Sequence, residues 1–310
     1  MTPQDPGVLP LHGLSHVRGA AQPPLSVRTI PGLFRETVTR FGDREAVVFG
    51  EQGVRWTWRQ FLVEVDRLAA GLRALGLRRG DRLGIWSPNR VEWLVTQFAT
   101  ARVGIVLVNI NPSYRLSELE YALQLSGCRA VVAAERLRTA DYLAMLQAVA
   151  PKLPALEFII RMGEGETPGM HRYADVLAAP EAVDVAALDT IEATLGCFDP
   201  INIQFTSGTT GHPKGATLTH HNVVNNAIAV AAAMRFTAAD KLCIPVPLYH
   251  CFGMVLAVLA CVSSGAAMVP GRDLRRGRDI GRRVRRGLHC AARRADDVHR
   301  RAGPSRFRHL

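Results

Sequence analysis

The chain has 310 residues, of which 48% are hydrophobic and 21% charged, and it carries a formal net charge of +11 at pH 7. This composition is typical of a folded globular protein and excludes an intrinsically disordered chain. The charge is local, because residues 271–310 hold fourteen arginines and four aspartates, while the rest of the chain has 24 basic and 23 acidic residues. The nearly neutral body argues against a general nucleic-acid or anionic-membrane surface.

Six cysteines are scattered along the chain without a C-x-x-C pair. This usage predicts free, mostly buried thiols in a cytoplasmic protein, and neither a disulfide framework nor a zinc site. Residues 1–28 are rich in proline and glycine and contain no hydrophobic segment like that of a signal peptide, so they are predicted to be an N-terminal extension. A transit peptide stays open as an alternative, because Asp5 is the only acid there.

From residue 29 onward, apolar patterns of helix and strand alternate. Thr57 and Gln60 have capping-box spacing ahead of an apolar stripe that ends near Gly76. A strand is expected over residues 82–86, followed by a helix that Asn89 caps. These positions predict the first turns of an α/β fold.

The alternation continues through the next segments. Residues 104–108 form a continuous apolar run, which is typical of a strand buried on both faces. Ser117 and Glu120 are expected to form a second capping box, with a further strand over residues 128–133. The pattern predicts parallel sheets with crossover helices.

A change of pattern suggests two lobes. Residues 161–197 are irregular and rich in glycine and proline, so a first lobe is expected over 29–197 and the start of a second over 198–270. The apolar run from Phe252 to Pro270 has the length of a membrane span. Ser263-Ser264-Gly265 interrupts it, which favours a buried helix followed by a short strand and no transmembrane segment.

The most informative segment runs from Thr206 to Ala216. It gathers four hydroxyls, three glycines and one lysine, and it lies between two segments that alternate like strands. Glycines let backbone N–H groups approach a ligand closely, and hydroxyls and an ammonium add donors suited to a polyphosphate. The segment is not a Walker loop, because Lys214 follows a proline and precedes glycine. A helix is expected after it, over residues 221–234.

This segment resembles the signature loop of the adenylate-forming acyl-CoA synthetases. In that family the loop lies between two strands and holds the β- and γ-phosphates of ATP. Two more segments fit the resemblance: Arg82 to Asn89 is similar to an early strand and turn of the family, and Pro247 to Gly253 is similar to its next core motif. Asn111 to Tyr121 is similar to the fatty-acyl branch, closest to the medium-chain synthetases. The resemblance covers roughly residues 29–270 and implies the N-terminal part of that fold, with the second lobe truncated.

The resemblance also implies a reaction. A fatty-acid carboxylate, expected to be of medium chain length, attacks the α-phosphate of ATP, and coenzyme A then displaces AMP. Mg²⁺ would bridge phosphate oxygens, since it takes few protein ligands. No protein residue is assigned as a metal ligand. His250 is expected to lie near the acyl-adenylate as the candidate catalytic residue, and Phe252, Gly253 and Met254 are candidates for the acyl pocket wall. The phosphate-binding residues implied are Thr206, Ser207, Gly208, Thr209, Thr210, Gly211 and Lys214.

Several family motifs have no counterpart in the sequence. The adenine-binding Gly-Tyr-Gly-x-Thr-Glu and ribose-binding Tyr-x-Thr-Gly-Asp motifs are not found, and neither are the hinge and the lid that supplies a catalytic lysine. Lys214 does not replace that lysine, because it belongs to the phosphate loop. The 310-residue chain is therefore expected to show little or no ligase activity by itself.

The arginine-rich residues 271–310 lack the periodicity of a buried strand and are predicted to be disordered. A shifted reading frame from about Gly271 explains the abrupt change, because codons can be chosen for residues 290–310 that encode a family-like string one base away. Resequencing the gene there tests this. Two alternatives to a ligase stay open: a non-catalytic fragment, and a nucleic-acid binder acting through the arginine-rich tail. No specific nucleic-acid partner is expected.

Overall fold

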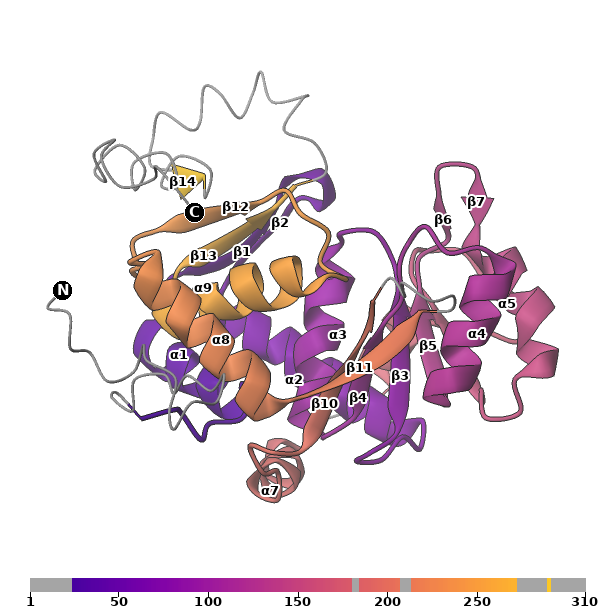
Figure 1. Cartoon of the computed structure of the whole chain (residues 1–310), viewed down its shortest axis with the longest axis horizontal. Helices are drawn as coiled ribbons and strands as arrows, with labels where there is room; N and C mark the ends of the chain where they lie inside the picture. The colour runs from indigo at the N-terminus through magenta and orange to yellow at the C-terminus, as the bar shows by residue number, and fades with distance from the viewer. Residues whose placement is uncertain (1–23, 180–183, 207–212, 272–288, 291–310) are drawn as a thin grey trace, which may run out of the picture.

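The computed structural model describes residues 24–179, 184–206, 213–271 and 289–290, and no side chain of the last pair. Within these ranges the strands form a seven-stranded sheet, a five-stranded sheet and a small antiparallel hairpin of β6 (Arg136–Leu137) and β7 (Ala140–Asp141). Figure 1 shows helices packed between the two sheets and further helices beyond the seven-stranded one. The seven-stranded sheet has the order β11 (Lys214–Thr219), β10 (Pro200–Thr206), β4 (Val106–Asn109), β3 (Arg82–Trp86), β5 (Ala130–Ala133), β8 (Phe158–Arg161), β9 (His171–Arg172).

All neighbouring strands of this sheet are parallel except β10 and β11, which form an antiparallel pair. Parallel neighbours need crossover connections, and the helices between successive strands supply them. The α/β class expected from the sequence is confirmed. The helices are α1 (Ile30–Phe41), α2 (Trp58–Ala74), α3 (Val91–Arg102), α4 (Leu116–Ser126), α5 (Tyr142–Val149), α6 (Tyr173–Ala178), α7 (Val185–Ala193), α8 (His220–Ala233), the π-helical η4 (Phe252–Leu259) and α9 (Ala260–Ser264).

The five-stranded sheet joins the two ends of the described chain. Its strands, in order, are β14 (His289–Cys290), β12 (Lys241–Ile244), β13 (Ala267–Pro270), β1 (Glu45–Phe49) and β2 (Val54–Thr57). In the seven-stranded sheet, β10, which begins after residue 197, pairs with β4, which lies before it. Each sheet therefore contains strands from before and from after residue 197. Pairing between strands distant in sequence leaves no local signal, so a linear pattern cannot place it.

Two helix starts differ from the sequence expectation, while a third is confirmed. Thr57 and Gln60 form the expected capping box of α2, with reciprocal bonds of 3.2 and 2.9 Å. Ser117, however, lies inside α4, and the Glu118 carboxylate accepts instead from the Arg115 backbone N–H at 2.9 Å. The expected Ser117–Glu120 box was wrong by two positions, because Arg115 already adopts the extended backbone of an N-cap.

Asn89 does not cap α3, whose N-cap is Arg90. The Gln52 side chain supplies the missing acceptor, taking the Val91 N–H at 2.8 Å. The amide of Asn89 instead forms hydrogen bonds with the backbone of Val246 and Leu248. The apolar run from Phe252 to Pro270 folds as expected into buried helical turns, η4 and α9, and the strand β13. In the described part of the chain, no helix combines the length and apolar character required to cross a bilayer.

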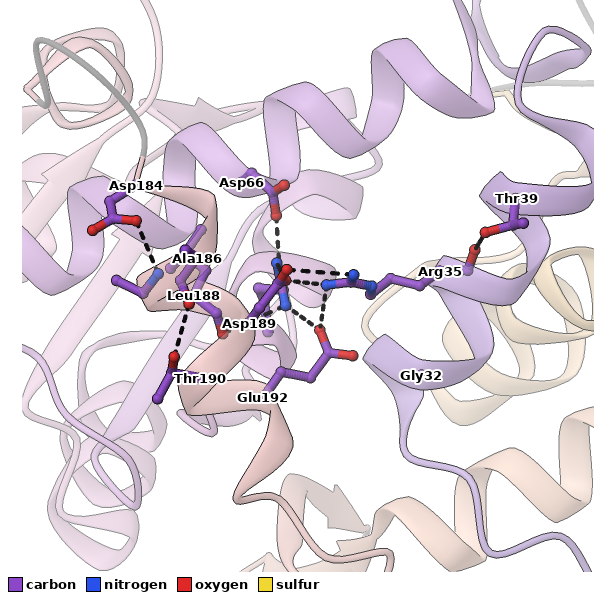
Figure 2. Close-up of polar contacts among 12 residues, drawn as sticks. Gly32, Arg35, Thr39, Asp66, Asp184, Ala186, Leu188, Asp189, Thr190 and Glu192 are labelled. Carbon is purple, nitrogen blue, oxygen red and sulfur yellow. Dashed lines mark hydrogen bonds and ion pairs between the residues drawn. The ribbon is translucent and has the colours of Figure 1, made fainter.

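The helix α7 is attached to the fold chiefly by charge, since Leu188 is its one buried residue. Figure 2 shows Asp189 and Glu192 of α7 next to the guanidinium of Arg35 on α1. Both acids also pair with the guanidinium of Arg102, which is 2% exposed. Arg102 also donates to Asp66 of α2 at 2.9 Å. Although burial by itself would lower the pKa of Arg102, its bonds to Asp189 and Asp66 raise that pKa. The guanidinium thus connects α2, α3 and α7.

Candidate functional site

The motifs singled out in the sequence meet at one edge of the seven-stranded sheet. The strands β3, β4 and β10 are parallel, so their carboxyl ends lie at the same edge. The turn with Asn89 follows β3, the Asn111–Tyr114 turn follows β4, and the signature loop follows β10. Figure 1 shows these three strands side by side. In open α/β sheets, ligands bind at this kind of edge.

The two ends of the signature loop are held by a hairpin. Thr206 and Lys214 are directly paired in the antiparallel β10–β11 register, and the Thr206 hydroxyl donates to the Lys214 carbonyl at 3.4 Å. Both side chains are exposed. Among the described residues, no acid forms an ion pair with the Lys214 ammonium, so its charge is open to a phosphate. The other implied phosphate-binding residues, Ser207, Gly208, Thr209, Thr210 and Gly211, lie outside the described residues.

His250 is exposed, and its hydrogen bonding defines its tautomer. The Nδ1 atom accepts the backbone N–H of Phe252 at 3.1 Å, so in the neutral ring Nε2 carries the proton. The imidazole can therefore donate from Nε2 to an oxygen of a bound group. The neighbouring Cys251 is half-buried, and burial raises the pKa of its thiol, which does not favour a thiolate nucleophile.

Asn89 joins two of the sequence motifs. Its Nδ2 donates to the Val246 carbonyl at 2.9 Å, and its Oδ1 accepts the Leu248 N–H at 2.8 Å. This pair of bonds holds the segment before His250 against the turn that follows β3. Local spacing predicted a capping role for Asn89 and did not indicate this bridge, which joins residues almost 160 positions apart.

The three candidate pocket-wall residues lie in different environments. Phe252 is 52% exposed, whereas Met254 is 1% exposed and belongs to the core. Gly253 is buried where the backbone folds back on itself, because a Cβ there would lie 2.3 Å from the Pro247 carbonyl oxygen. Of the three, Phe252 alone offers an exposed side chain to an acyl group.

We expect Gly253→Ala to lower the free energy of unfolding by about 1–3 kcal/mol, the usual cost of overpacking a filled site. The methyl group would meet backbone atoms of Pro247 and Leu248, which cannot rotate away. Urea titration followed by tryptophan fluorescence measures the change. Gly50→Ala is the matched control, since a Cβ at Gly50 meets no atom within 4 Å. Equal stability of the two variants would contradict the prediction.

His220 is the first residue of α8 and is fully buried. Its Nδ1 accepts the Ile30 N–H at 3.0 Å, which ties α1 to α8, and burial lowers its pKa to about 4. It lines a cavity of about 390 Å³ together with Arg79, Arg82 and Asp199. Arg82 and Pro200 begin β3 and β10, so this cavity lies at the opposite edge from His250.

The α/β fold and the hairpin-closed loop at the carboxyl edge define the class of the adenylate-forming enzymes, as the sequence predicted. The model of the AMP-binding enzyme family matches residues 34–285, and the chain belongs to this family. The match extends beyond residue 270, where the resemblance was expected to end.

Two curated relatives and one solved structure illustrate the similarity. The medium-chain acyl-CoA ligase ACSF2, mitochondrial, of Danio rerio is 42% identical over 266 residues, covering 81% of this chain and 44% of the relative. The putative acyl-CoA synthetase YngI of Bacillus subtilis is 40% identical over 258 residues, covering 79% and 47%. The apo structure of MbtA from Mycobacterium smegmatis superposes with a TM-score of 0.71 at 28% identity, covering 80% of this chain and 45% of that one. The chain thus spans about half the length of the curated relatives it matches.

The comparisons give no support to nucleic-acid binding. That alternative depends on residues 271–310, nearly all of which lie outside the described residues. Within the described residues, no disulfide joins the cysteines at positions 128, 197, 243, 251 and 261. The relative from Danio rerio is named as mitochondrial.

Proposed function

We propose that this chain contributes the phosphate-binding edge of an ATP-dependent fatty-acid–CoA ligase that acts on medium-chain acids. The observation that carries the proposal is the convergence of the signature loop, His250 and Asn89 at one sheet edge. Identity of about 40% to a medium-chain acyl-CoA ligase supports the substrate class. A cytoplasmic location, inferred from six scattered cysteines without a C-x-x-C pair, is part of the proposal.

The described residues have separate roles in this reaction. A carboxylate and ATP repel each other, so the site must offset negative charge and align the attack on the α-phosphate. Lys214 and the Thr206 hydroxyl would hold the pyrophosphate leaving group at the end of β10, together with the loop between them. Mg²⁺ would neutralise phosphate oxygens when bound, and coenzyme A would accept the acyl group. The Nε2–H of His250 would donate to an oxygen of the acyl-adenylate.

The exposed ammonium of Lys214 makes the proposal testable by binding alone. We expect the 310-residue chain to bind MgATP in isothermal titration calorimetry, and Lys214→Ala to weaken that affinity by about tenfold or more. This is the usual loss when a charged hydrogen bond to phosphate is removed. Lys152→Ala is the matched control, because Lys152 is also an exposed lysine and pairs with Glu120.

Two results would contradict the proposal. One is that wild type shows no MgATP binding, and the other is that Lys214→Ala and Lys152→Ala bind with equal affinity. Pyrophosphate release with octanoate and ATP reports on the complete reaction and is a separate measurement. The binding assay therefore decides the role of the loop whether or not the chain turns over.

A further inference from the structure

Three buried side-chain amides lie on the neighbouring strands β4 and β10. Asn109 and Asn202 are each 1% exposed, and Gln204 is 6% exposed. In the parallel register Gln204 lies opposite Asn109, and Asn202 lies opposite Leu107. Uncharged polar groups are costly to bury unless they are hydrogen-bonded, so the partners of these amides decide what they do.

The three side chains form a directed chain of hydrogen bonds, here called the amide ladder. Gln204 Nε2 donates to Asn202 Oδ1 at 2.9 Å, and Asn202 Nδ2 donates to Asn109 Oδ1 at 3.0 Å. Asn109 Nδ2 then donates to the backbone carbonyl of Tyr249 at 2.8 Å. The ladder thus runs from the strand that leads into the signature loop to the residue before His250.

Met254 closes the ladder from the other side. Its Sδ atom accepts from Asn109 Nδ2 and from Gln204 Nε2, each at 3.1 Å. Asn202 Nδ2 also donates to the Leu107 carbonyl at 2.9 Å. Every amide nitrogen of the ladder therefore donates to two acceptors. Turning any one amide over would place oxygen against oxygen, so the orientation of all three is fixed.

We propose that Asn109 is a positioning residue that holds the Tyr249–Met254 segment, and with it His250, at a set distance from the strand leading to the phosphate loop. The inference rests on the proposed function, because it assigns both segments to one reaction site. Apolar side chains would fill the same volume but would not fix the orientation of the segment, whereas hydrogen bonds are directional and do fix it. Asn89 anchors the same segment at Val246 and Leu248, so the ladder supplies the second fixed point beside His250.

The test compares three variants of the full chain with wild type. Asn109→Leu removes the donors to Tyr249 and Met254 while keeping a similar side-chain shape. Met254→Leu conserves volume and removes only the sulfur acceptor, so it folds even if the first variant does not. Val47→Ala removes core contacts of β1, a strand of the five-stranded sheet. It is the control for a loss of stability that leaves the amide ladder intact.

Two readouts separate positioning from general stability. In hydrogen–deuterium exchange mass spectrometry, we expect Asn109→Leu to accelerate exchange in residues 245–254, with a smaller change of the same kind in Met254→Leu. We expect MgATP affinity to fall by about tenfold in Asn109→Leu, because the aligned site becomes a minor state. Val47→Ala is expected to keep wild-type values in both measurements.

The inference would be overturned if residues 245–254 of Asn109→Leu exchanged at the wild-type rate. It would also be overturned if Val47→Ala changed exchange and MgATP affinity as much as Asn109→Leu does. If Asn109→Leu does not fold, an unchanged Met254→Leu overturns it. If wild type binds no MgATP, the proposed function fails, and exchange alone still decides whether Asn109 positions the His250 segment.

Discussion

Replacing Arg102 with methionine is expected to lower the free energy of unfolding by about 3–5 kcal/mol, the usual cost of removing one partner from a buried ion pair. The guanidinium is 2% exposed and contacts Asp66, Asp189 and Glu192. Without it, Asp66 and Glu192 stay largely buried, and burial already raises the pKa of both carboxyls. Urea denaturation measures the loss.

The control for this prediction is an exposed ion pair. Arg172→Met breaks the surface bridge to Asp175 and is expected to change stability little, since solvent screens such pairs. A triple variant, Arg102→Met with Asp66→Leu and Glu192→Met, should recover much of the stability by removing the unpaired acids as well. A loss in Arg102→Met no larger than that in Arg172→Met would show that the buried cluster does not hold α7 in place.

The second large effect is a pH dependence from His220. Burial lowers the pKa of its imidazole from 6.5 to about 4, so the unfolded chain binds a proton more readily than the folded chain between these values. Its contribution is fully present above pH 6.5 and is lost as the pH falls toward 4. The loss amounts to about 3 kcal/mol at most.

Denaturant titrations between pH 7 and pH 4 test this sign. His220→Asn keeps an acceptor near the Ile30 N–H but carries no titrating ring, so the stability of this variant should fall less steeply than that of wild type. The contributions of acidic residues to the pH dependence of stability are common to both proteins, so they cancel in the comparison. Parallel curves for wild type and His220→Asn would refute the prediction.

Short-range features of the fold were predicted correctly where the signal is local. The Thr57–Gln60 capping box and the strand over residues 82–86 depend on spacing within a few residues, and both were found. The same reasoning failed at Asn89 and Ser117. Asparagine is a good N-cap in isolation, but here distant carbonyl and N–H groups of residues 246 and 248 take its amide.

For the candidate site, too, local motifs could be identified from the sequence, whereas long-range contacts could not. The signature loop and the His250 motif were identified by their resemblance to a known family, which their residue types and spacing carry, and the roles of their residues stay predictions. The amide ladder was not foreseen. Asn202 and Gln204 read as the polar side of an alternating strand, yet both are buried because β4 and the Tyr249–Met254 segment cover them.

The sequence by itself determined the class of this protein: periodic apolar residues set the helices and strands, and a dense loop motif set the family. The tertiary structure alone decided which strands share a sheet, that Arg102 and His220 are buried, and that Asn89 and Asn109 hold the segment around His250. The physical reason is that hydrogen bonds and burial depend on groups brought together from up to about 200 residues away. Local propensity does not depend on those distant partners and cannot predict them.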